Sequence, residues 1–285
     1  MSERASDAMA RVMPFVPLAW LAVLFIGPLV MTIVYSFANA TFGGVQLAFT
    51  LTQYNQALSG FYLTIFLRTL EFAGLGTLLC LAVATPVAYV IAQKAGRLRP
   101  VLLVLLLVPF WTSFLIRTLA WETLLAANGP IRDALNFLGL HHGLLNVLDT
   151  KTAVFIGIVY GYLPLMALPL YVAFERIPAS VIEAGKDLGT GRVLTFLRVT
   201  LPMARPGLAT GMLLTFVPMT GEYIIPSLLG GDKGTLIGGL IAGQYLDSLD
   251  YPLGASMAVL ILLVLGAAVV VLTRVSRGFD PEPIP

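Results

Sequence analysis

Six long apolar stretches constrain this chain more than any other feature of its sequence. They lie at about 13–37, 65–92, 101–125, 153–174, 204–229 and 251–272. A helix needs about 20 apolar residues to cross a hydrocarbon core of ~30 Å, and each stretch is long enough. Because lipid offers no partner to the backbone N–H and C=O groups, a spanning segment must be a helix or part of a closed barrel. The runs are continuous rather than alternating, which excludes the barrel and predicts an all-α polytopic membrane protein with about six transmembrane helices.

The composition supports this assignment and excludes other classes. Charged residues make up 11% of the 285 residues, whereas a soluble domain usually carries about 25%. The formal net charge of +2 is too small to indicate a nucleic-acid partner. The single cysteine, Cys80, excludes an intrachain disulfide and a cysteine-based metal site.

The first stretch has a second interpretation as a secretory signal. Arg4 and Arg11 precede it, and Ala38-Asn39-Ala40 resembles a cleavage site. Its apolar run is well beyond the roughly 7–15 residues of a signal-peptide core, so we expect a retained first span.

Lysine and arginine residues gather on one side of the predicted topology. That side holds Arg4, Arg11, Lys94, Arg97, Arg99, Arg176, Lys186, Arg192, Arg198, Arg205, Arg274 and Arg277. The other side holds only Arg132, Lys151 and Lys233, together with His141 and His142. Since positive charge marks cytoplasmic loops, the first side and both termini are predicted to be cytoplasmic.

The connections carry further signals. Two outer connections, about 39–64 and 126–152, are amphiphilic and predict short helices or a re-entrant cap. Gly157 with Gly161, and Gly207 with Gly211, have the spacing that lets helices pack closely, a ligand contact being the alternative. Prolines predict bends in the fourth span (Pro164 and Pro169) and in the fifth (Pro218 and Pro226).

The inner connection at about 175–203 predicts two short helices. Ser180 is expected to cap the first helix with Glu183, and Gly189 to end it. Thr190 is expected to cap the second helix. The apolar face expected for the first helix consists of Val181, Ala184 and Leu188. Physical reasoning leaves two roles open for this hairpin, which either lies on the lipid surface or docks a cytoplasmic partner.

One pattern in this connection resembles a known family. Glu183-Ala184-Gly185, then Gly189, then Val199-Thr200-Leu201-Pro202, resembles the EAA loop of bacterial ABC importer permeases. Gly185 stands where that pattern has its second alanine and Val199 where it has isoleucine, but the spacing is unchanged. The resemblance implies a type I ABC importer permease fold over a single domain, 1–285. It also implies that Glu183, Ala184, Gly185 and Gly189 form a coupling helix that inserts into an ATPase subunit.

Two further motifs narrow the resemblance. Pro109-Phe110-Trp111-Thr112-Ser113-Phe114-Leu115-Ile116-Arg117, and the run from Gly221 to Gly231, are similar to spermidine/putrescine permeases of the B type. This implies a translocation pathway for a small cationic solute. Relatives that carry iron(III), opines or other small solutes share parts of these motifs, so such substrates stay open.

The resemblance also implies partners, because the chain has no nucleotide site of its own. Nothing matches G-x-x-x-x-G-K-[ST], so the chain is predicted to be neither an ATPase nor another enzyme, and to hold no cofactor. ATP and Mg²⁺ would bind two copies of a cytoplasmic ABC ATPase. A second permease, forming a heterodimer, and a periplasmic or lipid-anchored solute-binding protein would complete an importer in the bacterial inner membrane.

Ionisable residues inside the apolar stretches are candidates for the pathway, because such residues are costly in lipid. Glu222 follows Pro218 and Gly221, where the helix is expected to break, and Tyr223 and Trp111 could offer aromatic faces to an alkylammonium.

Arg117 and Glu122 are either solvated ends or gate residues, and Arg117 could instead pair with Glu222. Arg68 and Glu71, three residues apart, are expected to pair with each other.

Two other function classes remain as alternatives. A secondary transporter would need neither ATPase nor binding protein, but no inverted repeat is evident. A membrane enzyme would need a catalytic cluster; His141 and His142 are adjacent rather than four apart, and no G-x-S-x-G elbow occurs.

Overall fold

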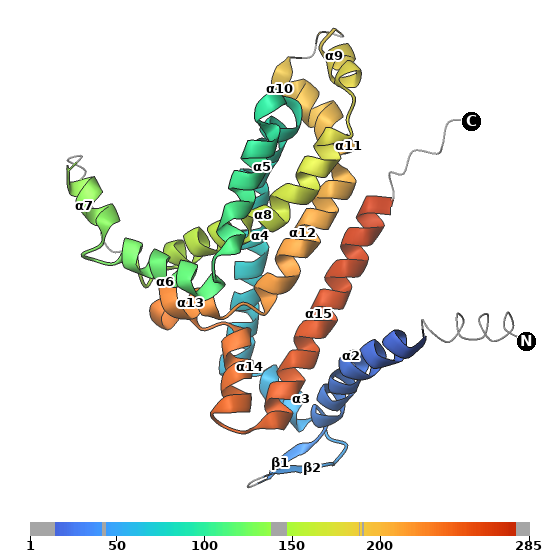
Figure 1. Ribbon diagram of the computed structural model, residues 1–285. Coiled ribbons are helices and arrows are strands. Elements are labelled where there is room, and N and C mark those ends of the chain that lie inside the picture. Colours follow the sequence, from blue (N-terminus) through green and yellow to red (C-terminus); the bar gives the residue numbers. More distant parts are fainter. Residues whose placement is uncertain (1–14, 42–43, 138–146, 188, 190, 278–285) are drawn as a thin grey trace, which may run out of the picture. The chain divides into compact units, whose positions relative to one another are not determined.

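The protein is described here from a computed structural model, which covers residues 15–41, 44–137, 147–187, 189 and 191–277. Helices account for most of these residues, as the apolar runs predict. Two compact units are distinguished: one combines residues up to 63 with 241–263, and the other combines 64–240 with the residues after 263. Figure 1 labels the elements of both.

The first unit begins with α2 (Phe15–Tyr35), none of whose most apolar window is buried within the chain. A short antiparallel hairpin follows, β1 (Asn39–Thr41) and β2 (Gly44–Gln46), and then α3 (Thr52–Ala57). The sequence predicts short helices or a re-entrant cap in this connection, and α3 is such a short helix, whereas the hairpin was not predicted. The chain between α2 and α3 is held together by ring stacking and by a side-chain bond. Phe37 stacks on Phe49 at 4.8 Å, and Tyr54 donates to Ser36 Oγ at 2.7 Å.

The second unit contains the elements that position the candidate site. They are α4 (Gly60–Gln93, from residue 64 on), α5 (Arg99–Leu107), α6 (Phe114–Leu125), α7 (Pro130–Phe137), α8 (Lys151–Glu175), α9 (Ala179–Asp187), α10 (Arg192–Thr195), α11 (Leu201–Met203), α12 (Arg205–Thr220) and α13 (Ile224–Leu229). Helices α14 (Ile237–Leu246) and α15 (Tyr251–Arg277) contribute residues to both units.

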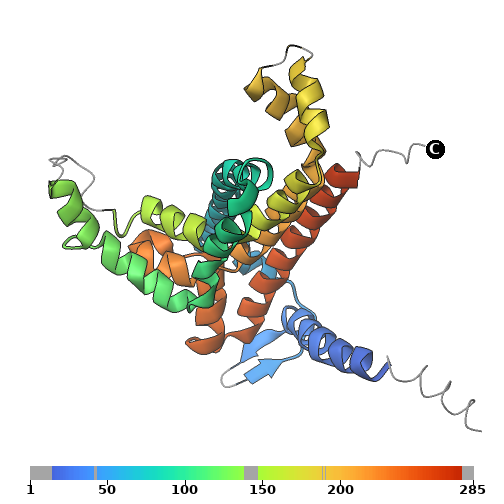
Figure 2. The ribbon, with the colours of Figure 1, turned by 45° about the horizontal axis from the view of Figure 1, so that its top comes forward.

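Helices α8 and α12 pack against each other through glycine. A Cβ atom at Gly207 would lie 2.4 Å from Ala173 Cβ, and one at Gly211 would lie 2.9 Å from Met166 Sδ. Only glycine permits this approach, so the packing interpretation of the Gly207–Gly211 spacing is confirmed. Figure 2 shows the two helices side by side, with the α9–α10 segment beyond their ends. The fully buried side chains around them include Phe72, Ile158, Met166, Leu170, Phe174 and Met219.

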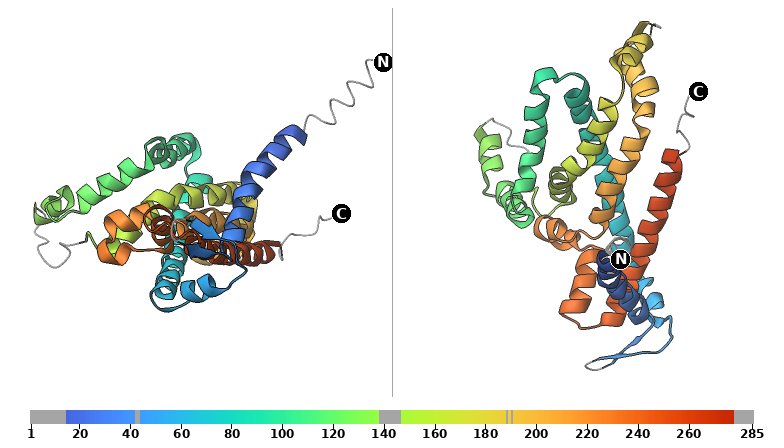
Figure 3. Two further views of the ribbon diagram at one scale, coloured as in Figure 1. Left: turned by 90° about the horizontal axis from the view of Figure 1, so that it is seen from below. Right: turned by 45° about the vertical axis from the view of Figure 1, so that its right-hand side comes forward.

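The spans differ from the expected six in two places. Four helices of the described chain are long and apolar enough to cross a membrane: α2, α4, α8 and α15. The third stretch is broken at Thr112–Ser113, where extended backbone separates α5 and its 3₁₀ extension from α6, and the chain bends by 92° (Figure 3). Counting this bent pair as one span gives five.

The fifth expected stretch, 204–229, is also interrupted. Helix α12 is 16 residues long and ends at Thr220, shortly after Pro218, and α13 begins only at Ile224. The break that Pro218 and Gly221 predict in this stretch is therefore confirmed, although hydropathy alone does not show it because both sides are apolar. By contrast, α8 continues as one helix through Pro164 and Pro169.

The expected Arg68–Glu71 pair is wrong. Glu71 instead forms an ion pair with Lys151 Nζ at 3.0 Å, and that ammonium also lies 5.6 Å from the centre of the Phe72 ring. The partner comes from the start of α8 rather than from the same helix, so the bond joins the predicted outer ends of α4 and α8.

Candidate functional site

The inner hairpin consists of α9, α10, a π-helical turn at Phe196–Thr200 and α11. Helix α9 starts at Ala179, so Ser180 lies inside its first turn and is not the cap that the sequence predicts. The first turn closes when Val181 N donates to Pro178 O at 3.1 Å. Gly189 has a φ of +81° and donates to Lys186 O at 2.9 Å, which agrees with its expected place after the helix. Leu188 and Thr190 lie outside the described residues.

The buried face of α9 is not the expected one. Ile182 and Gly185 are buried, whereas Glu183 and Ala184 are exposed and Val181 is half-buried. The reason is a close approach at Gly185: a Cβ atom there would lie 3.0 Å from Thr195 Cγ2 and 3.5 Å from Val199 Cγ2. The hairpin therefore turns Gly185 inward against its second arm, and Glu183 and Ala184 outward.

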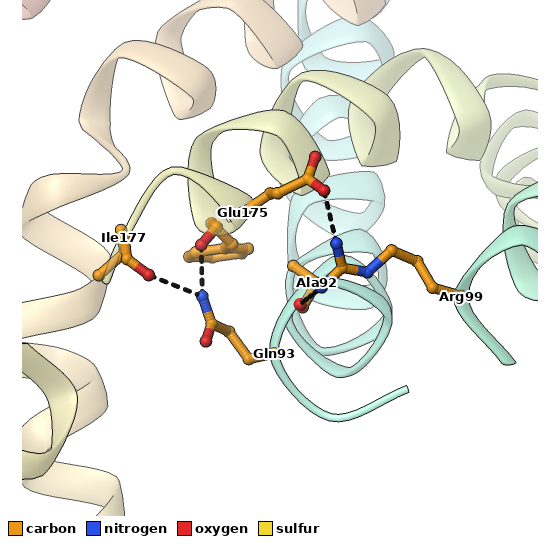
Figure 4. Close-up of polar contacts among 6 residues, drawn as sticks. Ala92, Gln93, Arg99, Glu175 and Ile177 are labelled. Atoms are coloured by element: carbon orange, nitrogen blue, oxygen red, sulfur yellow. Dashed lines mark hydrogen bonds and ion pairs between the residues drawn. The ribbon is translucent and has the colours of Figure 1, made fainter. Parts of the chain in front are cut away.

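A polar network attaches the start of the hairpin to the turn between α4 and α5 (Figure 4). Gln93 Nε2 donates to Phe174 O at 2.5 Å and to Ile177 O at 3.2 Å. Arg99 Nη1 pairs with Glu175 Oε1 at 2.6 Å, and Arg99 Nη2 donates to Ala92 O at 2.7 Å. The Phe174 carbonyl in the last turn of α8, and the Ile177 carbonyl just after that helix, thus accept from a side chain of α4.

The sequence interpretation missed this network. Arg99 was counted there only as one of many inner cations, although Glu175 ends an apolar stretch on that same basic side. That acid among cations was an available signal for the ion pair. Gln93 belongs to no pattern, so only the fold identifies it.

Replacing Gln93 with leucine is expected to lower the free energy of unfolding by about 1–2 kcal/mol, because at similar side-chain volume the Ile177 and Phe174 carbonyls both lose the Gln93 donor, although Phe174 O keeps its backbone bond from Ile177 N. Thermal unfolding of the purified chain in detergent measures this. Gln56→Leu, at an exposed position of α3, is the control and should change little. Equal melting temperatures for the two variants would mean that water replaces the Gln93 donor without cost.

Glu222 lies in the break between α12 and α13, at the end of α12 that is farther from the inner hairpin. Its Oε1 accepts from Ile224 N at 2.7 Å and from Ile225 N at 3.2 Å, and its Oε2 accepts from Tyr162 Oη at 2.6 Å. The side chain is only 8% exposed. The carboxylate thus satisfies the first donors of α13 and fastens that short helix to α8.

Arg117 does not form the alternative pair with Glu222. Its guanidinium lies 5.3 Å from the Phe110 ring centre and 5.6 Å from that of Phe114. Its Nε and Nη1 atoms are buried and have no hydrogen-bond partner among the described residues. The guanidinium therefore lies close to two aromatic rings rather than to a carboxylate of the described residues.

The remaining pathway candidates lie near the surface of the chain. Trp111 is 75% exposed, at the end of the 3₁₀ turn before the α5–α6 bend, and Tyr223 is 46% exposed. Glu122 is half-buried on α6. Within the described ranges, no hydrogen bond or ion pair joins any of these three to Glu222. The partner that Glu222 does have, Tyr162, was not a sequence candidate.

The enzyme alternative would need a catalytic cluster. In the part of the chain that the structure describes, no three His, Cys, Asp or Glu side chains lie close enough together to hold a metal ion. His141 and His142 lie outside that part.

Comparison with known proteins identifies the family. The model of the family described as "Binding-protein-dependent transport system inner membrane component" matches residues 4–282. The spermidine/putrescine transport system permease protein PotB of Escherichia coli (strain K12) is 36% identical over 261 residues, which cover 90% of this chain and 94% of that protein. PotB of Haemophilus influenzae is 31% identical, with 91% of each chain covered.

Solved structures agree on the fold. A bacterial ABC transporter that imports the acidic polysaccharide alginate contains a chain that superposes with a TM-score of 0.77 at 16% identity, over 98% of this chain and 100% of that one. A chain of the MetNI methionine ABC transporter gives 0.57 at 16% identity, over 77% and 96%. The fold is that of type I ABC importer permeases, and the secondary-transporter alternative is set aside. This chain belongs to the family of binding-protein-dependent transport system inner membrane components, and it is a multi-pass permease subunit of an ABC importer.

Proposed function

We propose that this permease forms the translocation pathway for a polyamine, spermidine or putrescine, in an ATP-driven importer. The assignment of the substrate rests on the 36% identity with PotB over 94% of that protein's length. The two units would act together as one permease domain, 1–285. Iron(III), an opine or another small solute is the alternative substrate class.

The inner hairpin, at about 175–203, would be the surface that receives the ATPase. Glu183 and Ala184 are exposed on α9, while Gly185 and Gly189 give the hairpin its shape. Two ATPase copies would each bind ATP and Mg²⁺, and this chain would bind neither. ATP binding would draw the two hairpins of the importer together, and the spans would then open toward the outer side.

A second permease and a soluble or lipid-anchored binding protein would complete the assembly. Helix α2 offers a surface on which the second permease could pack. Its apolar window has no buried face within this chain and needs protein or lipid against it. The distribution of Lys and Arg supports an arrangement with both termini in the cytoplasm and the Glu71–Lys151 pair outside.

The outer helix break would attract the substrate. Glu222 already accepts three hydrogen bonds, but a carboxylate offers about four acceptor positions, so one remains for an ammonium group. Tyr223 and Trp111 expose rings that suit cation–π contacts. Arg117 and Glu122 would flank this region as gate residues.

Uptake into proteoliposomes tests the proposal directly. The vesicles would hold this chain with its co-expressed permease and ATPase, and the loaded binding protein would be added outside with labelled spermidine or putrescine. We expect uptake only when ATP and every component are present. If a loaded binding protein stimulates ATPase activity but no polyamine enters the vesicles, the chain is part of an importer whose substrate is not a polyamine.

A further inference from the structure

A cavity of about 540 Å³ lies between the inner hairpin and α4. Its walls include Pro86 and Tyr89 of α4, Ile182 of α9, and Thr200 at the end of the π-helical turn. Ile182 belongs to the buried face of α9, whereas Glu183 and Ala184 are exposed. The cavity therefore lies behind the surface proposed for the ATPase.

Three cations from three segments line this cavity: Lys94 of α4, Lys186 of α9 and Arg192 of α10. None of the three takes part in an ion pair within the described residues, and none of the described lining residues is a carboxylate. Lys94 Nζ lies 5.6 Å from the centre of the Tyr89 ring. Three uncompensated cations around one space attract an anion and repel a polyamine.

A buried hydroxyl gives an independent indication of a ligand. Thr200 is fully buried and lines the cavity, and its Oγ1 has no hydrogen-bond partner in the described part of the chain. Buried polar atoms are nearly always paired. An acceptor or donor in the cavity would satisfy this one.

An apolar cleft adjoins the cavity. It measures about 520 Å³ and runs between α4 and α5, where Val87 and Val90 oppose Leu102 and Leu105. Pro86 lines both spaces. A cationic cavity and an apolar cleft that share a wall match a molecule with an anionic head and hydrocarbon chains.

We propose that this pair of spaces binds an anionic phospholipid. Its phosphate would lie among Lys94, Lys186 and Arg192, with Thr200 as a further donor, and an acyl chain would occupy the α4–α5 cleft. The inference uses the proposed cytoplasmic side of the hairpin, which places the lipid in the inner leaflet, but it does not depend on the transported substrate. Because Lys186 and Arg192 belong to the hairpin itself, the bound lipid would hold the hairpin to α4.

Native mass spectrometry of the purified full-length chain tests this without any transport assay. The protein would be exposed to equal amounts of phosphatidylglycerol and phosphatidylcholine. We expect the wild type to retain phosphatidylglycerol in preference to phosphatidylcholine. In the combined variant Lys94→Gln, Lys186→Gln, Arg192→Gln, the affinity for phosphatidylglycerol should fall about a hundredfold, because each cation contributes about fivefold. The charge-matched control is Arg97→Gln, Arg176→Gln, Arg274→Gln, whose three residues are exposed and line neither space.

Thr200→Val separates binding from folding. Removing an unpaired buried hydroxyl should not lower the melting temperature, but it should weaken the retention of phosphatidylglycerol severalfold. Equal retention by the two triple variants would overturn the proposal, as would equal retention of phosphatidylcholine. Inorganic phosphate that protects the wild type from unfolding, with no preference among lipids, would also overturn it and would indicate a soluble anion instead.

Discussion

Replacing Gly185 with leucine is expected to abolish ATP-driven uptake, although the chain should still insert into the membrane. A Cβ atom alone would lie 3.0 Å from Thr195 Cγ2, and the rest of a leucine side chain has no room against Val199. Helix α9 would have to move away from the second arm, which would reorient Glu183 and Ala184. The loss is measured as uptake into proteoliposomes and as the amount of ATPase that co-purifies with the permease.

Gly191→Leu is the matched control for this change. Gly191 lies in the same hairpin and is exposed, and a Cβ atom there would meet nothing within 4 Å. Its variant should retain most of the uptake and most of the bound ATPase. Equal activity of the two variants would show that the close packing at Gly185 has no part in coupling.

Replacing Glu222 with leucine is expected to destabilise the permease by roughly 3–5 kcal/mol. Tyr162 Oη and the N–H groups of Ile224 and Ile225 would all lose their acceptor in a buried place, and α13 would lose its attachment to α8. Thermal unfolding in detergent measures the change. A melting temperature like that of the wild type would contradict the structural role of Glu222.

Glu222→Gln separates that structural role from attraction of the substrate. Glutamine keeps an acceptor for the α13 donors and a group that can bond to Tyr162, so most of the stability should remain. If the negative charge attracts polyamine, uptake should fall with little change in melting temperature. Uptake with unchanged affinity and rate would remove Glu222 from the pathway.

Long-range sequence features predicted the fold, and local ones predicted only one of its two interruptions. Continuous apolar runs identify α2, α4, α8 and α15 because the length of a span follows from the thickness of the bilayer. Pro218 and Gly221 correctly indicated the break at Gly221–Tyr223. The break at Thr112–Ser113 was not predicted, because it lies inside an apolar run, where hydropathy carries no information about backbone direction.

Local spacing also failed to predict which side chains would become partners. Local spacing favoured Arg68 for Glu71 and Ser180 as the helix cap, but Lys151 and the Pro178 carbonyl take those places. The hairpin was found because its family pattern is specific. Its buried face depends on the close approach of Gly185 to Thr195, which no periodicity records.

The contact at Gly207 and Gly211 has a mechanical consequence. The backbone of α12 lies directly on α8, and no layer of long side chains separates them that could rearrange and let one helix slide past the other. The pair is therefore stiff where these two glycines meet α8. The hairpin end of α12 would therefore move together with α8, and at the other end Glu222 attaches the three-residue joint Gly221–Tyr223 to the same helix through Tyr162.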